Sequence, residues 1–381
     1  MTSAHPEIRQ KLDRWLTTLI RAKGSDLHLK TGSPVHARVK GNIVLLSKEI
    51  TGPESIRELT RYLMGKAYTD FEKTDEYDGA YSMNENYRFR VNIYRHLNGI
   101  SIACRLIPPV IRSIDSLNLP RTIHKLTDLR RGLVLVTGST GSGKTTTLAS
   151  IVHEINRKHP YHIITIENPV EYIFHDEKSI IEQRELGSHT ASFHSALRAS
   201  MREDPDVIVV GEVRDLKTAQ AVLEAADTGH LVFATMHTLD VRETVDRLIA
   251  IFPVDEQNRV SVTLAATIEA IVSQRLIKNV EGEMIPAVEM MFKSPLVSEL
   301  IRSRRENEIP DALEKESHSY GSILFDRSLF NLTLANKITE EQAFRYATNK
   351  NDLRLMFTLS KEYQRRRSSK EREQTVSLKN E

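Results

Sequence analysis

The sequence predicts an α/β protein in which a small α+β domain precedes a larger domain built on a parallel sheet. Three observations support this prediction. Segments with strand-type alternation of apolar and polar residues fill most of the N-terminal third. Beyond Arg131, short apolar runs alternate with longer helical patterns, which is typical of a parallel sheet covered on both faces. A glycine-rich loop joins the first of these runs to a helix.

The first part of the chain is expected to fold as a domain over residues 1–110. Apolar residues from Ile8 to Ile20 recur at helical spacing, and alternating strands follow, with GPESIRELTRYLMG as a helix between them. Pro108, Pro109 and Pro120 cannot lie in a continuous helix. Residues 111–127 are therefore the predicted linker.

The larger domain is expected to cover residues 128–358. Its first half carries the apolar runs GLVLVTG, HIITIE, DVIVVG and HLVFATMH. After about residue 255 the pattern predicts mostly helix, including the segment VSVTLAATIEAIVSQRLI. Residues 359–381 lack apolar periodicity, and we predict a basic, disordered tail there.

Composition excludes several classes of protein. The 381 residues include 53 Lys and Arg and 51 Asp and Glu, a formal net charge of +2, so no chain-wide basic surface exists and no nucleic-acid partner is expected. The single cysteine, Cys104, excludes an internal disulfide and a multi-cysteine zinc site. No apolar run approaches the roughly 18 residues of a membrane span, and the N-terminus lacks a hydrophobic signal region. We expect a cytoplasmic protein with no transmembrane segment.

A complete phosphate-binding pattern, G-x-x-x-x-G-K-S/T, lies between the apolar run LVLVT and a helix. Its glycines allow successive backbone N–H groups to surround a polyphosphate, and the following helix adds the positive end of its dipole. Lys144 would reach the β- and γ-phosphates, and the Thr145 hydroxyl would ligate Mg²⁺, so we predict ATP and Mg²⁺ as cofactors. The predicted nucleotide-binding residues are Gly138, Ser139, Thr140, Gly141, Ser142, Gly143, Lys144, Thr145 and Thr146.

Two acidic residues follow apolar runs of the predicted parallel sheet. Glu212 comes after DVIVV in the Walker B position, where it would hold Mg²⁺ together with Thr145, and Glu167 ends HIITIE. Because ligands of parallel sheets bind at the carboxyl ends of the strands, both carboxylates are expected to face the same nucleotide. Alone, each would more often be a helix cap or a turn former; beside a phosphate loop they predict a hydrolytic site.

Histidines stand at both ends of the run LVFATM. His237 lies at the carboxyl end, on the side expected to carry the nucleotide, and is the candidate for sensing the γ-phosphate. His230 lies at the other end, where a packing or capping role is expected. Their separation is too wide to argue for a shared metal ion.

These motifs together resemble one family, the ATPases of type IV pili and type II secretion. ITIENPVEY is similar to the family's aspartate box, REDPDVIVVGEVRD to its Walker B region and TGHLVFATMHT to its histidine box. SDLHLKTGSPVHARVKGNI and RFRVNIYRHLNGISIACRLIP resemble its PAS-like N-terminal domain. Within the family the chain looks most like pilus retraction ATPases of the PilT/PilU type.

The resemblance implies a PAS-like domain followed by a RecA-like ATPase domain with a helical C-terminal part. It further implies a homo-hexamer that hydrolyses ATP to retract pili in twitching motility, docked peripherally at the inner membrane on the pilus platform protein. In the same way, Glu167 is the implied general base, Glu212 the Walker B acid and His237 part of a nucleotide switch. Arg90 and Arg105 match arginines that reach nucleotide across an interface, although an exposed arginine on an alternating strand is also unremarkable.

Departures from the family pattern keep alternatives open. Asn168 stands where an aspartate is usual, and VSELIRSRR matches the retraction motif only in part. The C-terminal half looks closer to PilU than to PilT. An accessory nucleotide-binding subunit of a paralogous retraction motor is therefore one alternative. An extension or secretion ATPase is another, against which the single cysteine argues, because those proteins typically carry a tetracysteine zinc module.

Overall fold

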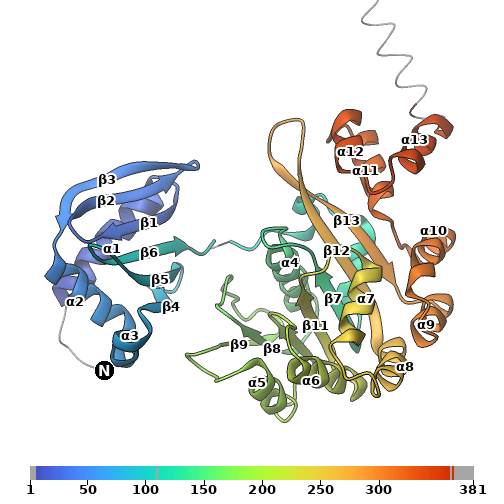
Figure 1. Ribbon diagram of the computed structural model, residues 1–381, viewed down its shortest axis with the longest axis horizontal. Helices are drawn as coiled ribbons and strands as arrows, with labels where there is room; N and C mark the ends of the chain where they lie inside the picture. The colour runs from blue at the N-terminus through green and yellow to red at the C-terminus, as the bar shows by residue number, and fades with distance from the viewer. Residues whose placement is uncertain (1–5, 109, 361–362, 364–381) are drawn as a thin grey trace, which may run out of the picture. The chain divides into compact units, whose positions relative to one another are not determined.

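The computed structural model describes residues 6–108, 110–360 and 363, and almost all of the predicted tail lies outside them. The chain forms two compact units, each with its own sheet (Figure 1). The first contains residues up to Ile111 together with Asn168–Phe174 and Glu185–His189, and the second contains the rest. The predicted fold class, α/β with two sheets and a helical C-terminal part, is confirmed.

The first unit is a six-stranded antiparallel sheet in the order β3-β2-β1-β6-β5-β4. Its strands are β1 (Gly24–Lys30), β2 (Ser33–Val39), β3 (Asn42–Thr51), β4 (Glu76–Ser82), β5 (Arg88–His96) and β6 (Gly99–Leu106). Its helices are α1 (Pro6–Arg21), α2 (Pro53–Met64), η1 (Gly65–Ala67) and α3 (Tyr68–Thr74). Alternate residues of the strands pack with Leu12, Leu16 and Leu19 of α1 into one core, as the amphipathic pattern predicts.

The second unit is built on a seven-stranded sheet in the order β13-β12-β7-β11-β10-β8-β9. Its strands are β7 (Gly132–Thr137), β8 (His162–Glu167), β9 (Ile180–Glu185), β10 (Val207–Val210), β11 (Leu231–Met236), β12 (Ile268–Lys278) and β13 (Met284–Phe292). The four strands predicted from apolar runs, β7, β8, β10 and β11, lie next to one another and are parallel. Their carboxyl ends therefore meet at one edge of the sheet.

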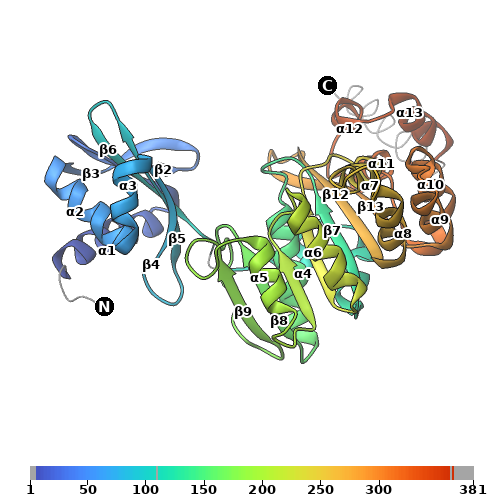
Figure 2. The same ribbon diagram turned by 60° about the horizontal axis from the view of Figure 1, so that its bottom comes forward.

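Helices cover both faces of this sheet, which is why its central strands are apolar throughout (Figure 1, Figure 2). One face carries α4 (Lys144–Lys158). The opposite face carries α5 (Phe193–Ser200), α6 (Leu216–Asp227), α7 (Val241–Ala250) and α8 (Gln257–Thr267). Among the described residues, no helix is long and apolar enough to cross a membrane.

The prediction of mostly helix after residue 255 is wrong between Ile268 and Phe292. Helix α8 ends at Thr267, and the chain then forms β12 and β13. β12 runs parallel to β7 and antiparallel to β13, and it is buried along most of its length. A run that is apolar on both sides has neither helical nor strand periodicity, so the pattern alone does not distinguish a buried strand from a buried helix.

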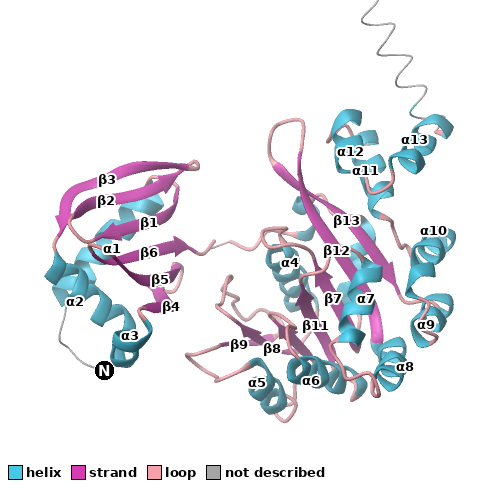
Figure 3. Cartoon of the chain, viewed as in Figure 1, coloured by secondary structure: helices cyan, strands magenta, loops and turns pink. Residues whose placement is uncertain are grey.

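The C-terminal part is helical, as predicted, and follows β13 without a further named strand in the described chain (Figure 3). It comprises α9 (Pro295–Arg302), η4 (Glu306–Glu308), α10 (Ile309–Tyr320), α11 (Phe325–Leu334), α12 (Glu340–Tyr346) and α13 (Lys350–Leu359). Phe325 and Leu329 of α11 and Phe357 of α13 form one core with Ile277 and Ile285 of the sheet. The last three helices are thus packed on the β12–β13 hairpin.

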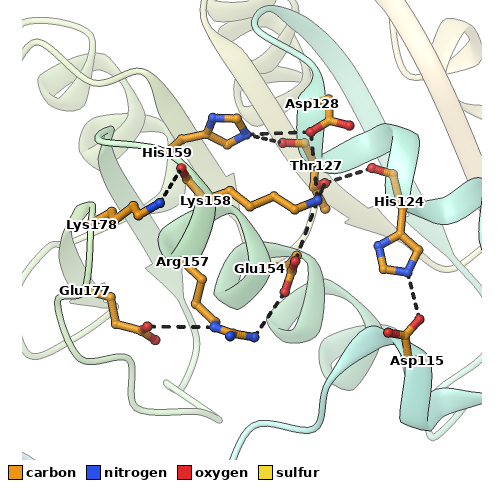
Figure 4. A network of polar contacts seen from close by, with 10 residues as sticks. All are labelled: Asp115, His124, Thr127, Asp128, Glu154, Arg157, Lys158, His159, Glu177 and Lys178. Atoms are coloured by element: carbon orange, nitrogen blue, oxygen red, sulfur yellow. Dashed lines mark hydrogen bonds and ion pairs between the residues drawn. The ribbon is translucent and has the colours of Figure 1, made fainter.

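The C-terminal end of α4 is fastened by a polar network to two 3₁₀ segments, η2 (Ile114–Leu117) and η3 (Arg121–Asp128) (Figure 4). Lys158 Nζ donates to the buried Thr127 hydroxyl at 3.0 Å, and His159 Nε2 lies 3.0 Å from the Thr127 carbonyl oxygen. His124 contacts Asp115 at 2.9 Å within the same network. These contacts fix the C-terminal end of α4, the helix that begins with Lys144 of the phosphate loop.

Candidate nucleotide site

The phosphate loop connects the end of β7, at Thr137, to the start of α4, at Lys144. Gly138 has φ +145°, and a Cβ there would approach the Gln274 carbonyl oxygen to 2.3 Å, so only glycine fits between the loop and β12. Gly141 has φ +78° and open space where a Cβ would point. The backbone at Gly141 is therefore accessible to a polyphosphate.

Lys144 folds back over this loop. Its ammonium donates hydrogen bonds to the carbonyl oxygens of Gly138 at 2.8 Å and Ser139 at 3.0 Å, and the side chain is buried. These contacts hold a positive charge inside the loop, where an anion would be attracted from solvent.

Ser142 fits the same interpretation. Its side chain is 3% exposed, and its Oγ has no hydrogen-bond partner among the described residues. A buried hydroxyl without a partner is costly, and a phosphate oxygen would satisfy it. The residues of the loop therefore fit the phosphates of a nucleotide, and the hydroxyl of Thr145 and the carboxylate of Glu212 are oxygen donors of the kind that would hold Mg²⁺.

Glu212 follows β10 and lies between two cationic or ionisable partners. Its Oε1 is 2.5 Å from Arg214 Nε and 3.0 Å from His237 Nε2. Burial by itself would raise the pKa of Glu212, but hydrogen bonds and charges from Arg214 and His237 outweigh burial and lower that pKa below its ordinary value. Glu212 is thus held as a carboxylate, which is the form that a metal or a nucleotide-bound water requires.

The loop that carries Glu212 is fixed to the strands on either side. Gly211 donates its N–H to Ile166 of β8 at 2.8 Å, and Val213 donates to Thr235 of β11 at 2.9 Å. The Thr235 hydroxyl in turn donates to the Gly211 carbonyl oxygen. Glu212 and His237 meet because both follow parallel strands that end at the same edge, as the sequence predicts.

Glu167 is at the end of β8, the other neighbour of β10. Its Oε1 accepts from the Thr165 hydroxyl at 2.6 Å and from Gln183 Nε2 of β9 at 3.1 Å. Both donors orient the carboxylate at the same sheet edge. By contrast, His230 at the opposite end of β11 has Nδ1 3.0 Å from the Ala225 carbonyl oxygen and so caps α6, the packing role expected for it.

A cavity of about 160 Å³ adjoins the loop on the side of β12 and β13. Gly143 and Thr146 line it from the loop and α4, and Arg112 and Asn118 line it from the preceding segment. Leu276, Ile285 and Pro286 give it an apolar wall. The cavity therefore adjoins the phosphate loop and has both polar and apolar walls.

Arg90 and Arg105 belong to the first unit, whereas the phosphate loop belongs to the second. They are direct cross-strand partners on β5 and β6, on the same face of the antiparallel sheet. Arg105 Nε donates to Asp26 Oδ1 at 2.8 Å, and Arg90 lies 3.7 Å from Asp78. Both arginine side chains are exposed and each faces an aspartate, so this face presents two adjacent arginine–aspartate pairs.

Two residues of the site were not found from the sequence. Arg214 pairs with Glu212. In the sequence, only its position two residues after Glu212, in GEVRD, could have indicated this contact. Gln274 accepts from the Thr147 hydroxyl and donates to the Ser142 carbonyl oxygen, both at 2.7 Å. Gln274 lies in the segment predicted as helix, so no pattern indicated that it would reach the phosphate loop.

Comparison with known proteins gives a consistent result. Residues 3–299 match the family model described as Type II/IV secretion system protein. The chain is 37% identical to the type IV pilus retraction ATPase PilT of Pseudomonas aeruginosa over 84% of this chain and 93% of that protein. It is 36% identical to the type IV pilus ATPase PilU of the same organism over 92% of each chain.

A solved structure is similar over nearly the same length. The crystal structure of the pilus retraction motor PilT with bound ADP superposes with a TM-score of 0.83 at 35% identity, covering 91% of this chain and 99% of that one. The resemblance therefore covers both units and the helical C-terminal part.

Proposed function

Because this chain belongs to the Type II/IV secretion system protein family, we propose that it is an ATP-hydrolysing motor that retracts type IV pili and so powers twitching motility. The contact between Glu212 and His237 carries the proposal. It joins a Walker B acid and a candidate γ-phosphate sensor at the edge of the sheet where the phosphate loop begins. Similarity to PilT and PilU over more than four-fifths of the chain supports the choice of process.

Each residue of the site has a proposed task. Bound Mg²⁺ would neutralise the charge that develops on the transferred phosphoryl group. Lys144 would hold the phosphates, Thr145 and Glu212 would hold the metal, and Glu167 would orient and deprotonate the attacking water. The cavity beside Gly143 would take the base and ribose. His237 would respond to the γ-phosphate through its contact with Glu212.

Assembly and location complete the proposal. The motor would be a homo-hexamer, alone or with a paralogous ATPase, working in the cytoplasm on the pilus platform protein of the inner membrane. Arg90 and Arg105, which are exposed cross-strand neighbours, would act on nucleotide held by a neighbouring subunit. Purified protein is expected to hydrolyse ATP only with Mg²⁺. Absence of activity, both alone and mixed with the paralogue, would contradict the proposal.

A second candidate is an accessory subunit that binds nucleotide and acts through a partner motor. The similarity to PilU over 92% of both chains favours keeping it. Cells carrying Glu212→Ala or Lys144→Ala separate the two roles. A motor loses function with either variant, whereas an accessory subunit tolerates Glu212→Ala and loses function only with Lys144→Ala.

A further inference from the structure

Three consecutive residues of β12 reach both faces of the second sheet. Because side chains alternate along a strand, Gln274 points to the α4 face and Ser273 and Arg275 point to the α7 face. Gln274 bonds Ser142 of the phosphate loop and Thr147 of α4, while the Ser273 hydroxyl lies 2.8 Å from that of Thr137, the last residue before the loop. β12 is therefore tied to the phosphate loop from both sides.

The loop that carries His237 is tied to the same place by buried hydroxyl groups. Thr238 Oγ1 lies 2.7 Å from Thr244 Oγ1; the Thr244 hydroxyl donates to the Asp240 carbonyl oxygen at 2.6 Å, and its oxygen lies 3.4 Å from Thr137 Oγ1. Thr137, Thr238 and Thr244 are fully buried. The chain of contacts therefore runs from the phosphate loop to the start of α7 without passing through solvent.

Arg275 connects the loop after His237 to helix α11. Its Nη2 donates to the carbonyl oxygen of Leu239, two residues after His237, at 3.3 Å. Its guanidinium also lies over the ring of Phe325, 4.1 Å from the centroid. Phe325 is the first residue of α11. One side chain thus contacts both the His237 loop and the first residue of α11.

Glu289, on the adjacent β13, joins the same two elements a second time. Its Oε1 accepts from the N–H of Val241, the first residue of α7, at 2.9 Å, and the backbone N–H of Phe325 favours the ionised form of the same carboxyl by lowering its pKa against the effect of burial. The N-cap of α11, Leu324, has no side chain able to cap the helix. A single buried carboxylate therefore serves the positive ends of two helices.

Glu289 and Arg275 are diagonal neighbours on one face of the hairpin, since Ser273 is the partner opposite Glu289. Burial, with the charge of Asp240, raises the pKa of the Glu289 carboxyl above its ordinary value, and the backbone N–H groups of Val241 and Phe325 and the charge of Arg275 oppose that rise. The contact with the N–H of Val241 and the influence of the Phe325 N–H oppose the cost of burial, and they relate this one carboxylate to the starts of both helices.

We propose that Arg275 and Glu289 are positioning residues that couple the His237 loop to the N-terminus of α11, so that nucleotide in the phosphate loop alters the stability of helices α11–α13. The coupling rests on the proposed function, because it needs nucleotide to bind at the phosphate loop. A change at His237 would move Leu239 and Val241, and both contacts at Phe325 would follow. The C-terminal helices would then be an output of the ATPase cycle.

Amide hydrogen exchange of the full-length protein, with and without Mg²⁺ and ATP, tests the coupling. In the unmodified protein, nucleotide is expected to change exchange in α4 and also in α11, the latter by about fivefold or more. Glu289→Gln and Arg275→Ala should abolish the response in α11 while α4 still responds. Glu281→Gln and Lys278→Ala, exposed neighbours on the same hairpin, should leave both responses intact.

The alternative outcomes are distinct. If the variants exchange faster in α11 but keep the nucleotide-dependent difference, the two residues only stabilise the fold and the proposal is wrong. A response in α4 without one in α11 of the unmodified protein would also overturn the coupling alone. No response in α4 would remove the proposed function as well. Arg275→Lys, which keeps the charge but not the planar stacking on Phe325, should give a partial response and guards against a variant that fails to fold.

Discussion

The two sheets of this molecule present polar side chains in different ways. In the second unit, the central strands are buried on both faces, so polar groups gather where the strands end, and Glu167, Glu212 and His237 share one edge. In the first unit, one face of an antiparallel sheet is exposed, and polar residues such as Arg90 and Arg105 alternate along the strands. In the parallel sheet, a polar residue directly after an apolar strand therefore marks the candidate site. In the antiparallel sheet, polar residues occur along every strand, so their position in the sequence does not single out a site.

The largest effect is expected at the strand ends of the parallel sheet. Glu167→Gln keeps the size of the side chain and removes the proposed base, so kcat for ATP hydrolysis should fall by about 10²–10⁴-fold. Steady-state kinetics at saturating Mg²⁺ and ATP measures this. His230→Ala, at the opposite end of β11, is the matched control and should leave kcat unchanged. An equal loss in both variants would contradict the importance of the carboxyl edge.

Lys144→Ala tests the phosphate loop itself. Removing the buried ammonium, which the Gly138 and Ser139 carbonyl oxygens hold in the loop, should lower ATP hydrolysis by about 10²–10³-fold and weaken nucleotide binding, because its positive charge would no longer stabilise the phosphates. Isothermal titration with ADP and an activity assay separate the two effects. Lys158→Ala, at the other end of α4, removes a lysine from the same helix and is expected to retain nucleotide binding.

Arg90→Ala and Arg105→Ala test whether the exposed face of the antiparallel sheet contributes to ATP hydrolysis. If this face acts on nucleotide, each variant should lower kcat by about tenfold to a hundredfold, the usual cost of a lost hydrogen bond to a charged group. Lys48→Ala, an exposed cation on β3 of the same sheet, should have no effect. Full activity in both arginine variants would restrict the site to the second unit.

The smallest effect concerns stability in acid. Arg214 and His237 hold the pKa of Glu212 below its unfolded value, so ionised Glu212 stabilises the fold above that unfolded value. The contribution is lost as the pH falls through the lower, folded pKa. Glu212→Gln should remove it and flatten the acid limb of the stability curve by no more than about 1 kcal/mol after solvent screening. Urea unfolding between pH 3 and pH 7 measures the difference, and an unchanged acid limb would show that the pairing is energetically unimportant.

The sequence predicted those features whose chemistry is local. The phosphate loop, the four parallel strands and the acids that follow them depend on short patterns, and each lies where it was expected. The β12–β13 hairpin was missed because a fully buried strand has no periodicity. Gln274 and Glu289 could not be found either, since their partners are far away in the chain and only the fold brings them together. The direct pairing of Arg90 with Arg105 likewise depends on strand register.

Whether the protein is a retraction motor can be decided from pilus number and twitching in cells that lack this gene and in cells to which the gene is restored, either in its native form or with Glu212→Ala. A retraction motor should give surplus surface pili and lost motility in the deletion, full rescue by the native gene and no rescue by Glu212→Ala. Bald cells in the deletion, or normal motility restored by Glu212→Ala, would contradict a retraction motor that works through the Glu212–His237 edge of the parallel sheet.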